Sequence, residues 1–358
     1  MSKFGLLIAS PIGSYKNIGD YIQSLAALQF MPKDSKYDFI EREKLSEYDN
    51  GDKVKCIMNA WYIWHPEYWP PKEMAIDPLL TSIHISPLMA DKMLAGKGKE
   101  YFIKHGPVGC RDTGTLEILE KNGIPSFFSG CLTLTLGEKY KTNTPRSGVI
   151  FVDPYFPPIR YVNDDKTIYY PLNLIKSIAF FLQNPRIIHK LAKKEFFKGK
   201  IKIQTYYNAS MFYHAYSNMF DNDTLINAEY ISHMIPVENN KCQEDWLDIA
   251  ENLVYKYSKA KYVVTSRIHC ALPCLGLETP VIFVLNKIMN AKFNASGRFG
   301  GLIDLFRLAS YTGNNVIPVD GCFDKSSKLS ENTVFSNKSN WKFYRNKLIN
   351  QVRHFMLK

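Results

Sequence analysis

Arg267 and His269 stand two residues apart in the stretch YVVTSRIHCALPC (262–274), where an apolar strand is expected to end and a short helix to begin. Ser266 can cap that helix, whose free N–H groups attract anions. A cation and an imidazole beside them suit an acidic substrate that needs a proton delivered. A lone histidine is more often a packed core or surface residue, but an arginine at the same turn favours a functional role.

A second charged stretch is GPVGCRD (106–112), which joins a short expected strand to a helix. Asp112 is a suitable N-cap, but capping gives no reason for Arg111. An arginine at a strand end can bind a carboxylate or phosphate through two hydrogen bonds. A salt bridge to a neighbouring acid is the alternative.

The third stretch is SPIGSYKNIGDYIQ (10–23), a glycine-bearing loop that leads into a helix. Gly19 permits a close approach of the backbone, and Asn17 or Asp20 can cap the helix. The loop matches neither of the familiar nucleotide-binding motifs. A ligand-binding loop and a plain capped turn are equally good interpretations.

Aromatic side chains gather in NAWYIWHPEYWPP (59–71), and they suit stacking on sugar rings. Trp61, Trp64 and Trp69 are the candidates, with core packing as the rival interpretation for each. Trp64 and Trp69, beside polar residues and prolines, are expected to be the more exposed. Arg298, in the glycine-rich loop 294–301, is a further candidate for an anionic group of either substrate.

Strand-like and helix-like stretches alternate along the chain, which predicts an α/β fold with parallel sheets. With 358 residues the chain has room for two domains at roughly 150 residues each. We expect two doubly wound units facing across a cleft, joined by the polar stretch 139–147. The expected single elements include strands at 54–63, 80–86 and 230–235 and a helix at 88–104. The region from residue 154 fits neither unit and is expected to be an insertion.

The net charge of +11 comes from two segments. Lys176–Lys202 has eight basic residues and one acidic, Lys338–Lys358 has six basic and none acidic, and the remainder carries −2. A near-neutral body argues against a nucleic-acid-binding protein. In the first segment basic and apolar residues interleave, as in helices at an anionic membrane surface, although a solvated face over a packed helix is equally consistent.

The remaining composition favours a cytosolic protein with no metal centre. No apolar run reaches the roughly 20 residues of a spanning helix, and the N-terminus does not resemble a signal peptide. Seven scattered cysteines fit reduced thiols better than a disulfide framework. Cys270 and Cys274 lack a second ligand pair, so packing is favoured over metal binding.

Taken together, three segments resemble the polysaccharide pyruvyl transferase family: NIGDYIQS, GPVGCRDTGTLEILEKNGI with SGCLTLTL, and TSRIHCALPCLGLETPVIF. They stand in the family's order over roughly residues 5 to 310. Arg267 and His269 match its Arg-x-His element, and Arg111 matches the arginine of its Arg-Asp element. The resemblance implies a glycosyltransferase-B-like fold with two Rossmann-type domains, and transfer of a pyruvyl group from phosphoenolpyruvate to a sugar as a ketal.

These implications give a specific assignment. His269 is the expected general acid and Asp20 the base; Arg267, Arg111, Ser266, Arg298, Asn17 and Gly19 are expected to bind the donor, and Trp61, Trp64 and Trp69 the acceptor. We expect an acceptor-side domain at 1–145, a donor-binding domain at 146–335 with an insertion at about 154–222, and a basic helix or tail at 336–358.

The expected partners are phosphoenolpyruvate as co-substrate, a lipid-linked or nucleotide-linked saccharide, and an anionic membrane at its inner face. No other cofactor, no metal and no nucleic acid is expected. The alternatives are a nucleotide-sugar glycosyltransferase of the same fold and a non-catalytic sugar- or anion-binding protein.

Overall fold

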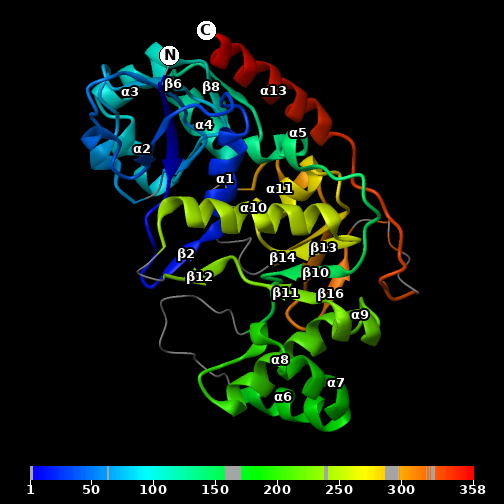
Figure 1. The fold of residues 1–358 in the computed structure, drawn as a ribbon. Coiled ribbons are helices and arrows are strands. Elements are labelled where there is room, and N and C mark those ends of the chain that lie inside the picture. Colours follow the sequence, from blue (N-terminus) through cyan, green and yellow to red (C-terminus); the bar gives the residue numbers. More distant parts are fainter. Residues whose placement is uncertain are drawn as a thin grey trace.

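Figure 1 shows the computed structural model of the chain, coloured from the N-terminus to the C-terminus. It describes residues 3–62, 64–157, 171–237, 241–286, 297, 299–319, 321, 323 and 327–358. Arg298 and residues 158–170 therefore lie outside the described residues, as do residues 294–296 of the loop 294–301.

The first half of the chain contains a four-stranded sheet in the order β3-β1-β4-β6, with all strands parallel. Apolar residues fill β1, and five of its six residues are buried. The elements of this half are β1 (Lys3–Ile8), β2 (Tyr15–Asn17), α1 (Ile18–Leu28), β3 (Tyr37–Glu41), β4 (Val54–Ile57), β5 (Trp61–Tyr62), β6 (Ile76–Leu79), β7 (His84–Ile85), α2 (Pro87–Met93), α3 (Lys97–His105), β8 (Val108–Cys110), α4 (Thr113–Lys121), β9 (Ser126–Phe128) and α5 (Gly137–Tyr140).

The second half contains a six-stranded sheet in the order β11-β10-β13-β14-β15-β16, parallel except for β16. Its strands β10, β13 and β14 are almost wholly buried, as expected for a parallel sheet covered on both faces. The elements of this half are β10 (Val149–Val152), α6 (Pro171–Gln183), α7 (Pro185–Ala192), α8 (Lys202–Tyr216), α9 (Asn222–Asn227), β11 (Glu229–Ile231), β12 (Met234–Pro236), α10 (Gln243–Lys259), β13 (Tyr262–Thr265), α11 (Ile268–Gly276), β14 (Val281–Asn286), β15 (Arg307–Tyr311), β16 (Val316–Pro318) and α13 (Trp341–Leu357).

The two halves share a hydrophobic core and a small sheet. Helix α1 packs against α10 and α11, and one cluster of buried side chains includes Leu6, Ile22 and Leu272. Strand β2 pairs antiparallel with β12, which places Asn17 opposite Met234. The parallel sheets confirm the predicted α/β class. Two domains facing across a cleft, and their boundaries, stay a prediction.

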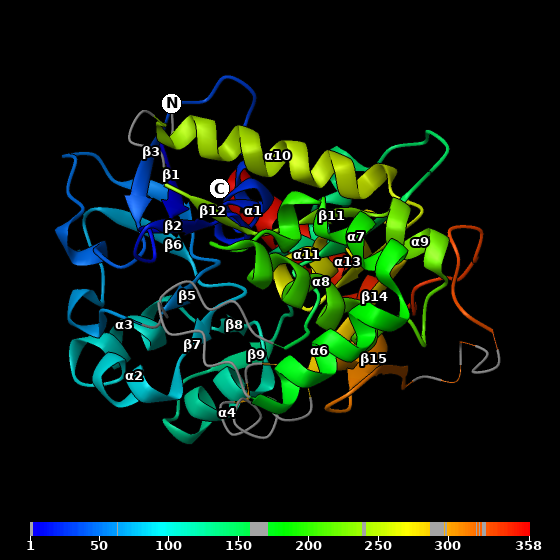
Figure 2. The same cartoon turned by 90° about the horizontal axis from the view of Figure 1, so that it is seen from below.

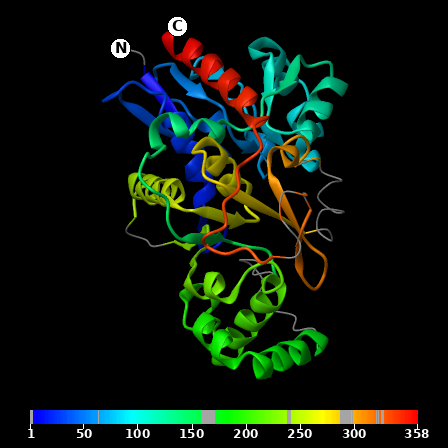
Figure 3. The same cartoon turned by 90° about the vertical axis from the view of Figure 1, so that its right-hand side faces the viewer.

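Helices α6, α7 and α8 form a lobe that projects from the second sheet (Figures 1 and 3). Their inner faces pack around aromatic side chains such as Phe197, Phe212 and Tyr216, next to Phe151 of β10. The lobe falls within the stretch expected to be an insertion. Figure 2 views it from below.

Helix α13 returns to the first half, at the end of the molecule opposite the lobe (Figure 1). Trp341, Leu348 and Val352 are buried on its inner face. Arg353 forms an ion pair with Glu138 at 2.7 Å. Part of the basic C-terminal segment is therefore used to hold this helix on the body of the protein.

Three expected single elements are each divided in the structure. The strand predicted at 54–63 is β4 followed by β5, which pairs with β7 in a separate sheet. The helix predicted at 88–104 ends near Met93 and restarts at Lys97, because Gly96 has a positive φ of 49°. The strand predicted at 230–235 divides into β11 and β12, which join different sheets. The expected strand at 80–86 is reduced to β7, which covers only residues 84–85.

Candidate functional site

Arg267 lies at the carboxyl edge of the six-stranded sheet, where it meets the largely buried carboxylate of Asp153. Its Nε is 2.8 Å from Oδ2 of Asp153, and the same Oδ2 accepts a hydrogen bond from the backbone N–H of His233 at 3.0 Å. The three residues follow β13, β10 and β11, which are parallel and so end at one edge. Arg267 retains 38% of its side-chain exposure, so its guanidinium reaches solvent while Asp153 orients it.

Asp153 and His233 were not found from the sequence, although both come within two residues of a strand end. Burial raises the pKa of Asp153, but the charge of Arg267 and the adjacent His233 outweigh it and hold the net pKa below its ordinary value. Asp153 also has a positive φ of 39°, which is strained for a residue other than glycine. Backbone strain and a partly buried ion pair at a strand end are both typical of a functional site.

His269 lies in the first turn of α11 and is 6% exposed. Ser266 does not cap this helix as expected: the N-cap position belongs to Arg267. The Ser266 hydroxyl instead donates to the carbonyl of Val284 at 2.9 Å and accepts from the N–H of Tyr155 at 3.0 Å. Ser266 therefore links the turn to the segment after β10 and to β14, which fixes the position of the backbone that carries Arg267 and His269.

The N-terminus of α1 contacts His269, which brings Asn17 and Gly19 of the first half to the Arg267 turn of the second. A Cβ on Gly19 would lie only 3.1 Å from Cβ of His269 and 3.2 Å from Nδ1 of His233. Asn17 caps the helix by accepting from the N–H of Gly19 at 3.2 Å, and the N–H of Ile18 donates to the carbonyl of His233 at 2.8 Å. These two N–H groups are therefore already used within the protein.

Asp20 lies beside that contact and forms a buried ion pair with Arg42. Arg42 Nη1 is 3.1 Å from Asp20 Oδ1, and the two side chains are 7% and 6% exposed. Oδ2 of Asp20 accepts from the Asn17 side chain at 3.4 Å. The ion pair borders a shallow hollow lined also by Gln23 and Asn59. The hollow lies at the ends of β1 and β4, where the chain switches from one side of the sheet to the other and where open α/β sheets bind ligands. Arg42 follows β3 directly and was not among the residues predicted from the sequence.

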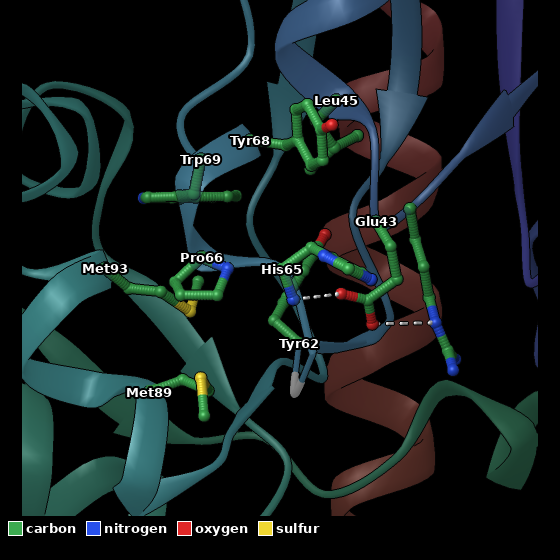
Figure 4. Close-up of a pocket in the computed structure, with 10 residues that line it drawn as sticks. Glu43, Leu45, Tyr62, His65, Pro66, Tyr68, Trp69, Met89 and Met93 are labelled. Atoms are coloured by element: carbon green, nitrogen blue, oxygen red, sulfur yellow. Dashed lines mark hydrogen bonds and ion pairs between the residues drawn. The ribbon is translucent and has the colours of Figure 1, made fainter.

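The three tryptophan side chains lie in different surroundings in the structure. Trp69 is 9% exposed and stacks on Phe102. It lines a second shallow hollow (Figure 4). Arg42 borders both hollows. The expected exposure of Trp69 was therefore wrong, because its ring fills the space under α3. Trp64 is 59% exposed, as expected, and its backbone N–H donates to Oε2 of Glu43 at 3.3 Å. The guanidinium of Arg111 lies over the ring of Trp61, with its Cζ 6.0 Å from the ring centroid.

Arg111 belongs to a second buried group. Its side chain is fully buried, with Nε 3.3 Å from Asp112, and within the described residues Nη1 and Nη2 have no hydrogen-bond partner. Asp112 caps α4 as predicted, accepting from the N–H of Thr115, and its other oxygen lies 2.6 Å from Nδ1 of His84. A buried guanidinium with two open nitrogens is an anion-binding feature.

Neither a metal cluster nor a membrane span is found in the part of the chain that the structure describes. The six cysteines described there are free. Burial raises the pKa of the Cys274 thiol, consistent with a packing role.

His233 makes the stability of the site depend on pH. Burial, together with the charge of Arg267, lowers its pKa from 6.5 to about 4, although Asp153 opposes this. Between these values the unfolded chain binds more protons than the folded one, so the free energy of unfolding should fall by about 3 kcal/mol from pH 7 to pH 4 through this residue alone. In His233→Gln this decrease of about 3 kcal/mol in the free energy of unfolding between pH 7 and pH 4, measured by urea unfolding, should disappear. An unchanged pH profile would show that His233 does not titrate in this way.

Comparison with known proteins gives one match. The family model described as polysaccharide pyruvyl transferase matches residues 17–287, a range that includes Asn17, Gly19, Arg111, Arg267 and His269. No curated protein and no solved structure matches the chain.

Proposed function

The chain belongs to the polysaccharide pyruvyl transferase family, and we propose that it transfers a pyruvyl group from phosphoenolpyruvate to a sugar of a surface-polysaccharide precursor. The product is a pyruvate ketal. The proposal rests above all on the convergence of Arg267, His269 and the N-terminus of α1. A cation and an imidazole thereby meet at one point of contact between the two halves.

Phosphoenolpyruvate carries a carboxylate and a phosphate, so its binding needs at least two cationic groups. Arg267 supplies one, with its orientation set by Asp153. Arg111 supplies the other from its buried group. Ser266, Asn17 and Gly19 shape the turn and the helix start beside the donor, and Arg298, outside the described residues, completes the set.

His269 is the proposed general acid. It protonates the methylene carbon of phosphoenolpyruvate, which leaves an electron-poor C2 that a sugar hydroxyl attacks. The C2–O bond to phosphate then breaks, phosphate leaves, and a second hydroxyl closes the ketal. Of the two hydroxyl protons, one replaces the proton that His269 gave to the new methyl group, and the other leaves with the phosphate. Phosphoenolpyruvate is a co-substrate here, and the scheme uses no other cofactor and no metal.

The acceptor binds on the first half in this proposal. Asp20 accepts a hydroxyl proton at the hollow that it shares with Arg42, and Gln23 Oε1 lines the same wall without a hydrogen-bond partner among the described residues. Trp64, which is exposed on the segment that lines the adjoining hollow, is the ring offered to a sugar face, with Trp61 on the same segment. Arg42 borders both hollows and so lies between them.

In this proposal the enzyme works in the cytoplasm, at the inner face of the membrane, on a lipid-linked or nucleotide-linked saccharide.

Isothermal titration tests the donor. Wild-type protein should bind phosphoenolpyruvate and not a panel of nucleotide sugars, and Arg267→Ala should lose that binding. Arg307→Ala is the matched control, because Arg307 begins β15 at the opposite sheet edge and donates to the carbonyl of Ser336. Binding of a nucleotide sugar in place of phosphoenolpyruvate would identify a glycosyltransferase, and binding of neither would reject the donor assignment.

A further inference from the structure

Helix α6 exposes an apolar stripe on the outside of the lobe. Leu174, Ile178 and Leu182 stand four residues apart, so they lie on one face, and Ile175 lies beside them. Their exposed fractions are 36%, 53%, 70% and 65%. Four large apolar side chains in one row are unusual on the surface of a water-soluble protein and mark an interaction site.

The stripe is not left over from incomplete packing of the lobe, because the opposite face of α6 is occupied. Phe180 stacks on His214 with 3.8 Å between ring centroids, and Phe181 packs edge-on against Tyr206. Ser177 on the same side is 4% exposed. Helix α6 thus packs one face against α8 and exposes a second, apolar face.

Exposed basic side chains follow this stripe in the next helix and at the start of α8. Helix α7 follows α6 after the single residue Asn184 and packs against it, with Arg186, Lys190 and Lys193 all exposed. After α7, Lys200 and Lys202 alternate with Ile201 and Ile203, which are 61% and 70% exposed. The only acidic residue from 171 to 202, Glu195, forms an ion pair with Lys198 at 2.6 Å.

We propose that the outer face of this lobe, formed by α6, α7 and the start of α8, docks on an anionic lipid bilayer. Apolar side chains enter the interface while lysines and arginines meet acidic headgroups, the combination that stabilises helices lying in a membrane surface. A protein partner would also cover apolar residues, but the strong excess of positive charge matches an anionic surface. The proposal rests on the proposed function, since it names the surface at which that function would operate.

The structure also separates the two basic segments. Helix α13 lies at the opposite end of the molecule from the lobe (Figures 1 and 3). Its apolar face is buried on the body, and Arg353 is paired with Glu138. One flat membrane cannot contact both ends, so the lobe, and not the C-terminal segment, is assigned to the bilayer.

Flotation of the full-length protein with vesicles tests the assignment. Vesicles of 70% phosphatidylcholine and 30% phosphatidylglycerol should bind the protein at least tenfold more tightly than pure phosphatidylcholine. Ile178→Glu/Leu182→Glu should weaken that binding tenfold or more, as should Arg186→Gln/Lys190→Gln/Lys193→Gln. Both variants change exposed side chains only, and an unchanged thermal midpoint verifies that they fold.

Phe343→Glu/Leu357→Glu on α13 is the matched control, with the same number of exposed apolar side chains replaced. It should bind anionic vesicles like wild type. Loss of binding in this control, or wild-type binding by the Ile178→Glu/Leu182→Glu variant, would overturn the assignment to the lobe. A concentration-dependent dimer that the same substitutions dissociate, with no vesicle binding, would assign the stripe to a second copy instead.

Titration with phosphoenolpyruvate in vesicle-free buffer separates this proposal from the proposed function. The Ile178→Glu/Leu182→Glu variant should keep wild-type donor affinity. A protein that binds vesicles but not phosphoenolpyruvate would refute the donor and leave the docking surface intact. The reverse result would refute the docking surface alone.

Discussion

Replacing His269 with Asn should lower kcat by roughly 10²–10⁴-fold while leaving the affinity for phosphoenolpyruvate within about threefold of wild type. Asparagine keeps a polar side chain of similar size but cannot deliver a proton to the methylene carbon. His269 lies in the first turn of α11, where its backbone is fixed by the Ser266 contacts. Turnover measured by phosphate release and donor affinity measured by titration would give the two quantities separately.

His233→Gln is the natural comparison for this experiment. His233 lies near the same contact with Gly19, but its Nε2 is 2.7 Å from the hydroxyl of Tyr257 and its low pKa keeps it neutral. It should therefore not serve as an acid, and its variant should retain kcat to within a few-fold. Full activity in His269→Asn, or a larger loss in His233→Gln, would remove the acid role from His269.

The local parts of this site could be predicted from the sequence because short-range rules govern them. Asn17 and Asp112 cap their helices as their residue types indicate. Arg267 and His269 follow a buried strand, and the strand-to-helix turn places them at a sheet edge. A parallel sheet then brings the ends of its strands together whatever lies between them in the sequence.

The partners of these residues could not be predicted, since they depend on strand order. Asp153 meets Arg267 only because β10 lies beside β13, although 114 positions separate the two residues. Arg42 meets Asp20 across the ends of β3 and α1 in the same way. Trp69 shows the related limit for burial: its polar and proline neighbours predict exposure, but packing against Phe102 determines its position.

Arg111→Met should abolish detectable binding of phosphoenolpyruvate, a loss of roughly 100-fold or more, without lowering the thermal midpoint. Two charge-assisted hydrogen bonds to the donor account for a loss of this size. Arg111 is fully buried, and within the described residues its Nη1 and Nη2 have no partner. An apolar side chain of similar volume removes the cost of desolvating the guanidinium, which offsets the loss of the ion pair with Asp112. Asp112 keeps His84 and Thr115 as partners.

Arg146→Met provides the contrast, because Arg146 is an arginine with a structural role. Its guanidinium donates to the carbonyls of Ser258, Leu277 and Glu278 at 2.7–3.2 Å, so its loss should lower the free energy of unfolding by about 2–3 kcal/mol and leave donor affinity unchanged. Opposite effects of the two substitutions on stability and binding identify Arg111 as an arginine kept for its ligand at a cost to the fold. If Arg111→Met instead unfolds the protein as Arg146→Met does, its buried charge serves the core, and the second cation for the donor must be sought elsewhere.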